Sequence, residues 1–338
     1  MSLRSSRLAK GLLVFLWAIF CIVITDITVG TLFRDRLVLQ EDERNLTYQY
    51  DPELGWFPIA NSKKSFTGSR TIFVEHNSRG FRDIEHSIGA KPRMIFLGDS
   101  FVWGYDVEQP ERFTEKLREK LPDWSIYNLG VSGYGTDQEY LLLKRHYDFY
   151  RPQIVFLVFC RDNDDDDNSR NVRYGAYYKP YFTVDGGGLS LRGVPVPQSE
   201  NYFFSRHNLL ARSNGVRLLM RAYYILTAPP DYIALKPPTQ AILADMQQFV
   251  KSKGGRLVVG LQSSYPELEQ FLNKRSIPYV DLSNSYRYPT QSRHWTPEGH
   301  TFVSEKIKTF LINGHYLQTV AERSPQSKTH NASPPSGP

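Results

Sequence analysis

The chain has 338 residues, 41% of them apolar and 22% charged, with a formal net charge of +6. This length leaves room for a membrane segment and one large α/β domain, and the apolar fraction suffices for a sizeable core. Lysine and arginine residues are scattered, and no basic helix carries interleaved aromatic residues, so the composition argues against nucleic-acid binding. The two cysteines, Cys21 and Cys160, lie in unlike segments, and we expect neither a disulfide nor a cysteine-based metal site.

An apolar stretch near the N-terminus predicts a membrane anchor. Residues 11–33 are almost wholly apolar and are long enough to cross about 30 Å of hydrocarbon. The exception, Asp26, would lie near the outer end, where a carboxylate reaches the headgroups at modest cost. Three basic residues precede the stretch: Arg4, Arg7 and Lys10. Because basic residues mark the cytoplasmic flank of a span, we expect residues 1–34 to be a cytoplasmic N-terminus and a single-pass transmembrane anchor.

The rest of the chain would then lie on the periplasmic or extracellular side of the cell inner membrane. The alternative for the same segment is a cleaved signal peptide. Signal peptides have a shorter apolar core and small residues before the cleavage site, which Thr28-Val29-Gly30 match poorly. Both interpretations export the domain.

Residues 35–90 are polar and rich in turns, with a strand pattern at Thr71–Val74. We interpret them as a small β-rich lead-in that packs on the main domain.

From residue 91 to residue 320, strand patterns alternate with helical patterns. The predicted strands are Met94–Leu97, Ser125–Asn128, Ile154–Phe159, Arg256–Leu261 and Pro278–Val280. Five apolar strands that alternate with helices predict a parallel sheet with both faces covered.

The predicted helices between these strands are Thr114–Lys120, Thr136–Tyr150, Ala241–Lys253 and Pro297–Leu311. The alternation stops at about residues 168–238, which we interpret as an insertion on the active edge of the sheet, with a helix over His207–Leu226. Five tyrosines crowd the insertion and offer either stacking faces for sugar rings or its own core: Tyr174, Tyr177, Tyr178, Tyr181 and Tyr202. Residues 321–338 have the composition of a disordered tail.

The first strand pattern ends in Gly98-Asp99-Ser100, and a helical pattern follows. A parallel strand delivers such a serine to the carboxyl edge of the sheet, where open α/β folds bind their ligands. The second strand is followed by glycines, including Gly133, that lead into a helix. Their unhindered N–H groups suit an oxyanion, although, taken alone, the glycines are better explained by a tight strand-to-helix turn.

The third strand is followed by Asn163 within an acidic run, and an asparagine there would bring an amide donor to the same edge as Ser100. The run invites a calcium interpretation, but the positions where a calcium loop needs glycine and glutamate hold Asp167 and Arg173. We therefore expect no metal and interpret most of these aspartates as a solvated loop or a helix start. Far along the chain, His294 precedes a helix that contains His300, so His294 is free to approach the serine as an activating base.

These residues, in this order, resemble the SGNH hydrolases, also called GDSL-type esterases. The blocks of that family are Gly-Asp-Ser, a glycine, an Asn-Asp pair and a terminal Asp-x-x-His. They match Gly98-Asp99-Ser100, Gly133, Asn163-Asp164 and His294. The resemblance covers about residues 91–315 and implies a flavodoxin-like three-layer αβα sandwich with a five-stranded parallel sheet. The lead-in is similar to that of membrane-anchored bacterial members linked to surface polysaccharides.

The resemblance implies that Ser100 is the nucleophile and His294 the general base, with no cofactor. The oxyanion hole would comprise the N–H groups of Ser100 and Gly133 and the side-chain amide of Asn163. One position departs from the pattern, because the family acid should lie three residues before His294 and Gln291 stands there. The site is then a Ser-His dyad, a triad completed by another acid, or a weak or inactive site. Asp281, after the fifth strand, is the candidate acid.

The sequence thus predicts a membrane-anchored, export-side serine esterase that removes O-acyl groups, above all O-acetyl, from a carbohydrate or surface polysaccharide. Two alternatives share its residues. One is an O-acyltransferase in which a sugar hydroxyl replaces water. The other is a non-catalytic polysaccharide-binding assembly subunit, which the missing family acid favours.

Overall fold

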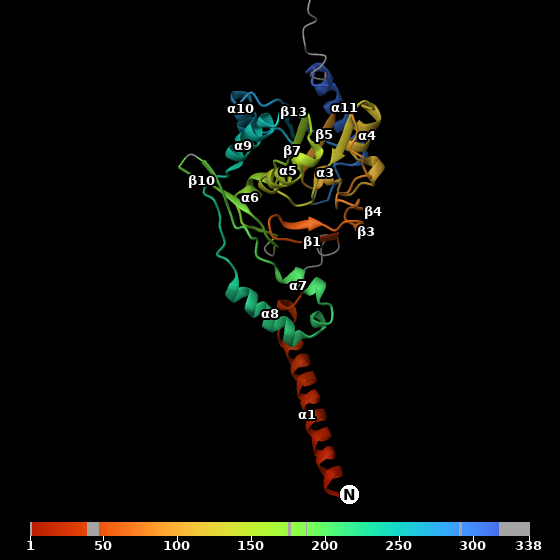
Figure 1. Cartoon of the computed structure of the whole chain (residues 1–338), viewed down its shortest axis with the longest axis vertical. Helices are drawn as coiled ribbons and strands as arrows, with labels where there is room; N and C mark the ends of the chain where they lie inside the picture. Colours follow the sequence, from red (N-terminus) through yellow and green to blue (C-terminus); the bar gives the residue numbers. More distant parts are fainter. Residues whose placement is uncertain (1, 39–46, 175–176, 187, 291–292, 318–338) are drawn as a thin grey trace, which may run out of the picture.

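The computed structural model describes residues 2–38, 47–174, 177–186, 188–290 and 293–317. Its centre is a parallel sheet of five strands in the order β13-β12-β7-β5-β6 (Figure 1). The strands are β5 (Arg93–Gly98), β6 (Ser125–Asn128), β7 (Ile154–Phe159), β12 (Arg256–Leu261) and β13 (Tyr279–Asp281). Counted along the chain, this order is 2-1-3-4-5, that of flavodoxin-like folds. The predicted fold class is confirmed.

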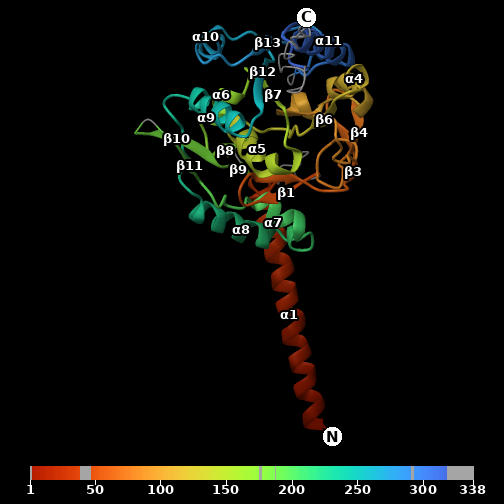
Figure 2. The same cartoon turned by 45° about the horizontal axis from the view of Figure 1, so that its top comes forward.

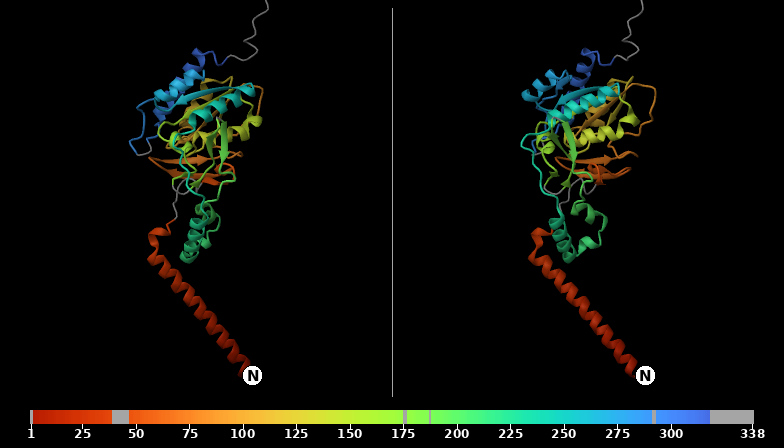
Figure 3. Two further views of the ribbon diagram at one scale, coloured as in Figure 1. Left: turned by 90° about the vertical axis from the view of Figure 1, so that its left-hand side faces the viewer. Right: turned by 60° about the vertical axis from the view of Figure 1, so that its left-hand side comes forward.

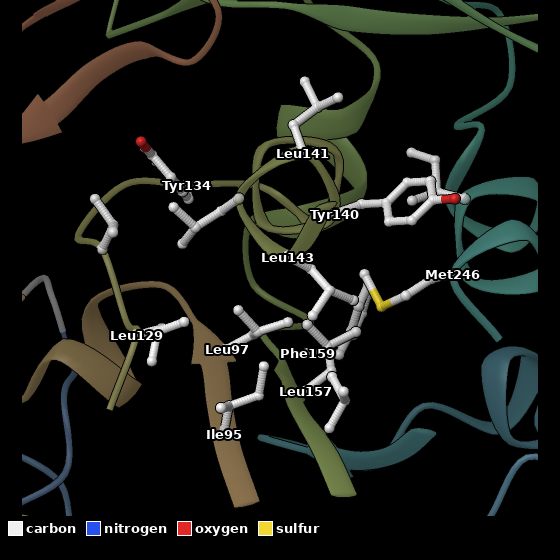
Figure 4. Close-up of a cluster of buried hydrophobic side chains, with 14 of the residues drawn as sticks. Ile95, Leu97, Leu129, Tyr134, Tyr140, Leu141, Leu143, Leu157, Phe159 and Met246 are labelled. Atoms are coloured by element: carbon white, nitrogen blue, oxygen red, sulfur yellow. The ribbon is translucent and has the colours of Figure 1, made fainter. Parts of the chain in front are cut away.

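Helices cover both faces of the sheet. They are α4 (Phe113–Lys120) and α11 (Pro297–Asn313) on one face, and α5 (Thr136–Tyr150), α9 (Thr239–Ser252) and α10 (Pro266–Lys274) on the other. Along β5, Ile95 and Leu97 pack on one side while Met94 and Phe96 pack on the other, because successive strand side chains alternate. Figure 4 shows the first side, where Met246 of α9 lies with α5 over the sheet.

The lead-in consists of two antiparallel hairpins. One pairs β1 (Tyr48–Asp51) with β2 (Gly55–Pro58), and the other pairs β3 (Lys63–Thr67) with β4 (Thr71–Glu75). Trp56 of β2 is fully buried in the main core, and Ile72 and Val74 of β4 pack on Trp103. These contacts hold the lead-in against the α/β domain.

The insertion carries two short hairpins followed by helices that lie between the domain and the N-terminal helix (Figure 1). Its elements are β8 (Val172–Arg173), β9 (Tyr177–Tyr178), β10 (Tyr181–Asp185), β11 (Gly188–Arg192), α7 (Glu200–Arg206), the 3₁₀ helix η3 (Leu210–Arg212) and α8 (Asn214–Thr227). The single helix expected over His207–Leu226 is wrong. Ser213 breaks it, because its hydroxyl accepts a hydrogen bond from the Val216 N–H at 3.2 Å and caps α8.

The N-terminal helix α1 (Ser2–Leu32) projects away from the domain (Figures 2 and 3). Within it, Ala9–Leu32 has a mean hydropathy of 2.6 and the length of a membrane span. A signal sequence near an N-terminus can also reach this length and hydropathy. The predicted tail, residues 321–338, lies outside the described residues.

Candidate active site

Ser100 lies where the chain leaves β5. It is the first residue of the short helix α3 (Ser100–Trp103), and the Asp99 carboxylate caps this helix by accepting from the Phe101 N–H at 2.9 Å. The connections after β5 and β7 lead to opposite sides of the sheet, so a ligand crevice is expected between these two strand ends. Ser100 follows β5, and Asn163 follows β7.

His294 reaches this edge from the loop before α11. Its Nε2 lies 2.7 Å from Ser100 Oγ, a hydrogen-bond distance. The imidazole stacks on Tyr105, with ring centres 4.3 Å apart, and also contacts Phe101. Only 8% of His294 is exposed. The two aromatic rings therefore fix the plane of the imidazole against the serine.

The other imidazole nitrogen faces Asp106. Asp106 Oδ2 lies 3.6 Å from His294 Nδ1, and Asp106 is fully buried. This separation exceeds a good hydrogen bond, but catalytic hydrogen bonds are often long without substrate and shorten when it binds. Ser100, His294 and Asp106 thus stand in the order of a serine, base and acid triad.

Asp106 is held by the turn between β3 and β4. The Ser69 N–H donates to Asp106 Oδ1 at 2.6 Å, and the Ser69 hydroxyl donates to Oδ2 at 2.8 Å. A Cβ on Gly68 would lie 2.2 Å from Asp106 Oδ1, so this approach needs a glycine. Burial raises the pKa of Asp106, but the neighbouring His294 imidazole and the hydrogen bonds from Ser69 outweigh it and hold the pKa below its usual value.

Sequence reasoning missed Asp106 because it sought the acid near His294 and after the fifth strand. Asp106 instead follows the serine by one short helix. Its backbone φ is 66°, a left-handed conformation in which aspartate is enriched, and this is the one local signal at the position.

The structure does not bring Asp281 to the imidazole. Asp281, at the end of β13, is exposed, and its Oδ1 accepts from the N–H and hydroxyl of Ser283. Among the described residues, Asp106 is the carboxylate within 4 Å of His294. Gln291 lies outside the described residues.

Gly133 lies in the loop after β6 with a φ of 80°, which favours glycine. Lead-in residues anchor this loop, since the Tyr48 hydroxyl accepts from the Ser132 N–H and the Trp56 indole donates to the Ser132 carbonyl. Within the described chain, neither the Gly133 N–H nor the Ser100 N–H has an acceptor. Both amides are therefore available to a ligand oxygen.

The Asn163 amide is turned toward carboxylates. Its Nδ2 donates to Asp164 Oδ1 at 3.3 Å and to Asp167 Oδ2 at 3.0 Å, and it stands at the start of α6 (Asp164–Asn168). An amide nitrogen has two protons, so Asn163 can point one at a ligand only by giving up the longer bond.

The acidic run is a helix start, as expected, but not all of it is solvated. Asp164 and Asp167 are buried. The Asp164 carboxylate accepts from the Cys160 N–H at 2.9 Å, and its pKa lies well above the usual value because of burial and the neighbouring charge of Asp99. In the described part of the chain, no group of three or more His, Cys, Asp or Glu residues could hold a metal ion.

His300 and two of the five insertion tyrosines are buried. His300 is buried on α11, and its Nδ1 accepts from the Phe113 N–H at 3.2 Å. Tyr177 and Tyr202 are buried and pack edge to face, with ring centres 5.4 Å apart. These two tyrosines belong to the main hydrophobic core, which they share with Trp56 of the lead-in.

A polar cavity of about 560 Å³ opens at the same edge of the sheet, against the loop that leads to His294. Its lining includes Tyr288 and Arg293, and the Tyr288 N–H donates to the His294 carbonyl at 2.9 Å. The other lining groups are hydroxyls, an amide, a carboxylate and two guanidinium groups: Ser263, Ser283, Ser285, Asn284, Asp162, Arg161 and Arg287, with Pro289. The cavity offers many hydrogen-bond partners and little apolar surface.

Among known proteins, the chain resembles solved structures only at the level of the fold. No protein-family model matches the chain, and no curated protein matches its sequence. The chain is similar to a putative lipolytic protein of the G-D-S-L family from Desulfitobacterium hafniense DCB-2, with 11% identity and a TM-score of 0.40, over 65% of this chain and 100% of that one.

Two further similar structures are esterases. The psychrotrophic esterase EstA from Pseudoalteromonas sp. has 11% identity and a TM-score of 0.39, over 67% of this chain and 100% of that one. An acetylxylan esterase from Geobacillus stearothermophilus has 11% identity and a TM-score of 0.37, over 66% of this chain and 95% of that one. Likenesses this distant leave the assignment of a function to the side-chain geometry above.

Proposed function

We propose that the protein is a serine esterase with a Ser100–His294–Asp106 triad. The observation that carries the proposal is the 2.7 Å contact between Ser100 Oγ and His294 Nε2, with Asp106 at the other imidazole nitrogen. His294 takes the hydroxyl proton as Ser100 attacks an ester carbonyl, and Asp106 stabilises the imidazolium that forms. The imidazolium then protonates the leaving alcohol, and water releases the acid from the acyl-enzyme.

The oxyanion would be held by the N–H groups of Ser100 and Gly133. A preorganised donor of this kind is typically worth about 10²–10³-fold in rate. Asn163 would join them once its bond to Asp164 yields. The non-catalytic alternative was favoured only by the missing family acid at position 291. In the proposed triad, Asp106 would supply that acid.

The substrate that suits this site is an O-acylated carbohydrate, with acetyl as the leading acyl group. The cavity against the loop that leads to His294 is lined by hydroxyl, amide and guanidinium groups, which hydrogen-bond sugar hydroxyls. These polar side chains do not form an apolar tunnel for a long acyl chain.

The test is the Ser100→Ala variant on an activated acetyl ester and on an acetylated polysaccharide. We expect turnover to disappear while the circular dichroism spectrum stays that of the wild type. A fluorophosphonate probe should label the wild type and leave the variant unlabelled. Equal turnover by the two proteins would show that Ser100 is not the nucleophile.

We also propose that α1 anchors the enzyme in a membrane with the α/β domain on the export side. The support is the apolar span Ala9–Leu32 and the basic residues at its N-terminal end, Arg4, Arg7 and Lys10. Alkaline phosphatase fused after residue 90 should be active in a bacterial host, because it folds only after export. Activity from a cytoplasmic reporter alone at the same junction would reverse the topology.

A further inference from the structure

Helix α8 presents an apolar stripe that nothing in the described chain covers. Four of its residues follow the i, i+3, i+4, i+7 spacing of one helix face and are exposed: Leu219, Ala222, Tyr223 and Leu226. Leu219 is 72% exposed and Leu226 is 85% exposed. Exposed apolar faces of this kind mark contacts with proteins or membranes.

The opposite face of α8 is polar and is bound to the protein. Arg217 Nη1 donates to the Leu37 carbonyl at 3.3 Å, and Arg221 donates to the Glu200 carboxylate and to the Arg36 carbonyl. These contacts fix the rotation of α8 about its axis. The apolar stripe therefore faces away from the domain.

The start of α8 is attached to α1 through Asp26. The Asp26 Oδ1 accepts from the Ser213 hydroxyl at 2.7 Å and from the Gly215 N–H at 2.9 Å, and its Oδ2 accepts from Asn214 Nδ2 at 3.2 Å. A carboxylate at the N-terminus of a 14-residue helix also meets the positive end of the helix dipole. Asp26, the one acidic residue within the apolar span, is thus used to hold α8.

The two helices also touch closely one turn further along α1. A Cβ on Gly30 would lie 2.5 Å from Asn214 Nδ2, so the glycine allows the approach. Ala9–Leu32 has 24 residues and, at 1.5 Å per residue, spans about 36 Å, more than the ~30 Å hydrocarbon core. The excess of about 6 Å corresponds to about four residues, so the last turn of α1, where Gly30 meets α8, reaches the headgroup level.

We propose that α8 is a membrane-interface helix whose stripe of Leu219, Ala222, Tyr223 and Leu226 inserts among the lipid headgroups of the outer leaflet. The inference rests on the proposed anchor, and it goes beyond it, because a single span alone would let the domain tilt freely. Tyr223 suits the position, since tyrosine is enriched at membrane interfaces. Ile225, which is also exposed, widens the apolar surface of α8.

The experiment uses the full chain in vesicles of phosphatidylethanolamine and phosphatidylglycerol. Spin labels are placed one at a time at Leu219→Cys, Tyr223→Cys and Leu226→Cys in a Cys21→Ser background, where the other cysteine, Cys160, is buried. Collision rates with oxygen, which enriches in lipid, and with a water-soluble nickel chelate are measured. Val184→Cys, an exposed apolar position on the β10–β11 hairpin, is the matched control.

We expect the three stripe labels to show an oxygen-to-nickel accessibility ratio several-fold above that of the Val184 position. A label on native Cys21, in the middle of α1, reports separately on the anchor. Stripe labels as open to nickel as the control, with the Cys21 label in lipid, would overturn the interface helix alone. Stripe labels shielded from both reagents would mean a protein partner or a second copy covers the stripe, which also overturns it. A Cys21 label in water would overturn the anchor and the helix together.

Discussion

At the scale of single residues, the proposed triad predicts that kcat depends strongly on the charge of Asp106. Asp106→Asn keeps the shape but removes the charge that stabilises the imidazolium. We expect kcat on an activated acetyl ester to fall by up to about 10⁴-fold, the loss known for the equivalent change in a serine protease. Because the pKa of Asp106 lies below its usual value, the wild-type carboxylate stays charged in mildly acidic buffer, and the deficit should persist at acidic pH.

The matched controls are Asp281→Asn and Gln291→Asp. Asp281 contacts Ser283 and not the imidazole, so its amide variant should keep the wild-type rate. With Asp106 already serving His294, a carboxylate at position 291 should bring no gain. A large loss in Asp281→Asn, with Asp106→Asn unaffected, would assign the acid to β13 instead.

The sequence located the serine and the histidine of the candidate site because both stand next to strong local signals, a strand end and a helix start. Asp106 has no such signal beyond its left-handed backbone. Its position depends on Gly68 and Ser69, which the β3–β4 hairpin of the lead-in brings against it. Contacts of this kind follow from tertiary packing, which residue spacing alone does not reveal.

At the scale of elements, the strands of the α/β domain could be predicted within one residue at each end, since buried parallel strands are continuous apolar runs. Helix α10 (Pro266–Lys274) was missed because its nine residues carry few apolar positions, with Leu268 and Leu272 buried. The insertion could be located, but its predicted helix, His207–Leu226, begins seven residues before α8 does. A capping serine ends one helical segment and starts the next there, and apolar periodicity runs across that break.

The contact between α1 and α8 leads to a prediction for Asp26. Asp26→Ala removes the acceptor of three hydrogen bonds from Ser213, Asn214 and Gly215. We expect the N-terminal turn of α8 to fray, because losing a helix-capping interaction typically costs about 1 kcal/mol. Hydrogen exchange of residues 213–218 in detergent micelles should accelerate, while exchange in α5 stays unchanged. Unchanged exchange at both places would show that the carboxylate does not hold α8.

At the scale of the whole molecule, the domain keeps a cluster of carboxyl groups in its interior, beneath the candidate site. Glu139 of α5 is fully buried, and within the described chain neither of its carboxyl oxygens has a hydrogen-bond partner. Burial, together with the charges of Asp164, Asp99 and Asp137, raises its pKa well above the usual value. Glu139 is therefore protonated in the folded protein at a pH where it would ionise in the unfolded chain.

This difference fixes the sign of a pH effect on stability. A folded-state pKa above the unfolded one means that the contribution is complete below the unfolded pKa, about 4.3, and is lost as pH rises toward the folded value. Glu139→Gln replaces the protonated carboxyl by a neutral group of the same shape. Each unit by which the pKa is raised corresponds to about 1.4 kcal/mol, or roughly 3–6 °C in the melting temperature of a domain this size.

We therefore expect Glu139→Gln to melt at a higher temperature than the wild type at pH 8 and at nearly the same temperature at pH 4. Thermal unfolding of the full chain in detergent, followed by circular dichroism across this range, measures the difference. Glu119→Gln, at an exposed position of α4, controls for the general loss of a negative charge and should show no such trend. A gap between Glu139→Gln and the wild type that stays constant with pH, or that grows toward pH 4, would mean that Glu139 is ionised in the folded domain. The interior carboxyls would then be charged together and would have to be neutralised by Lys179, which already binds the buried Asp137 carboxylate.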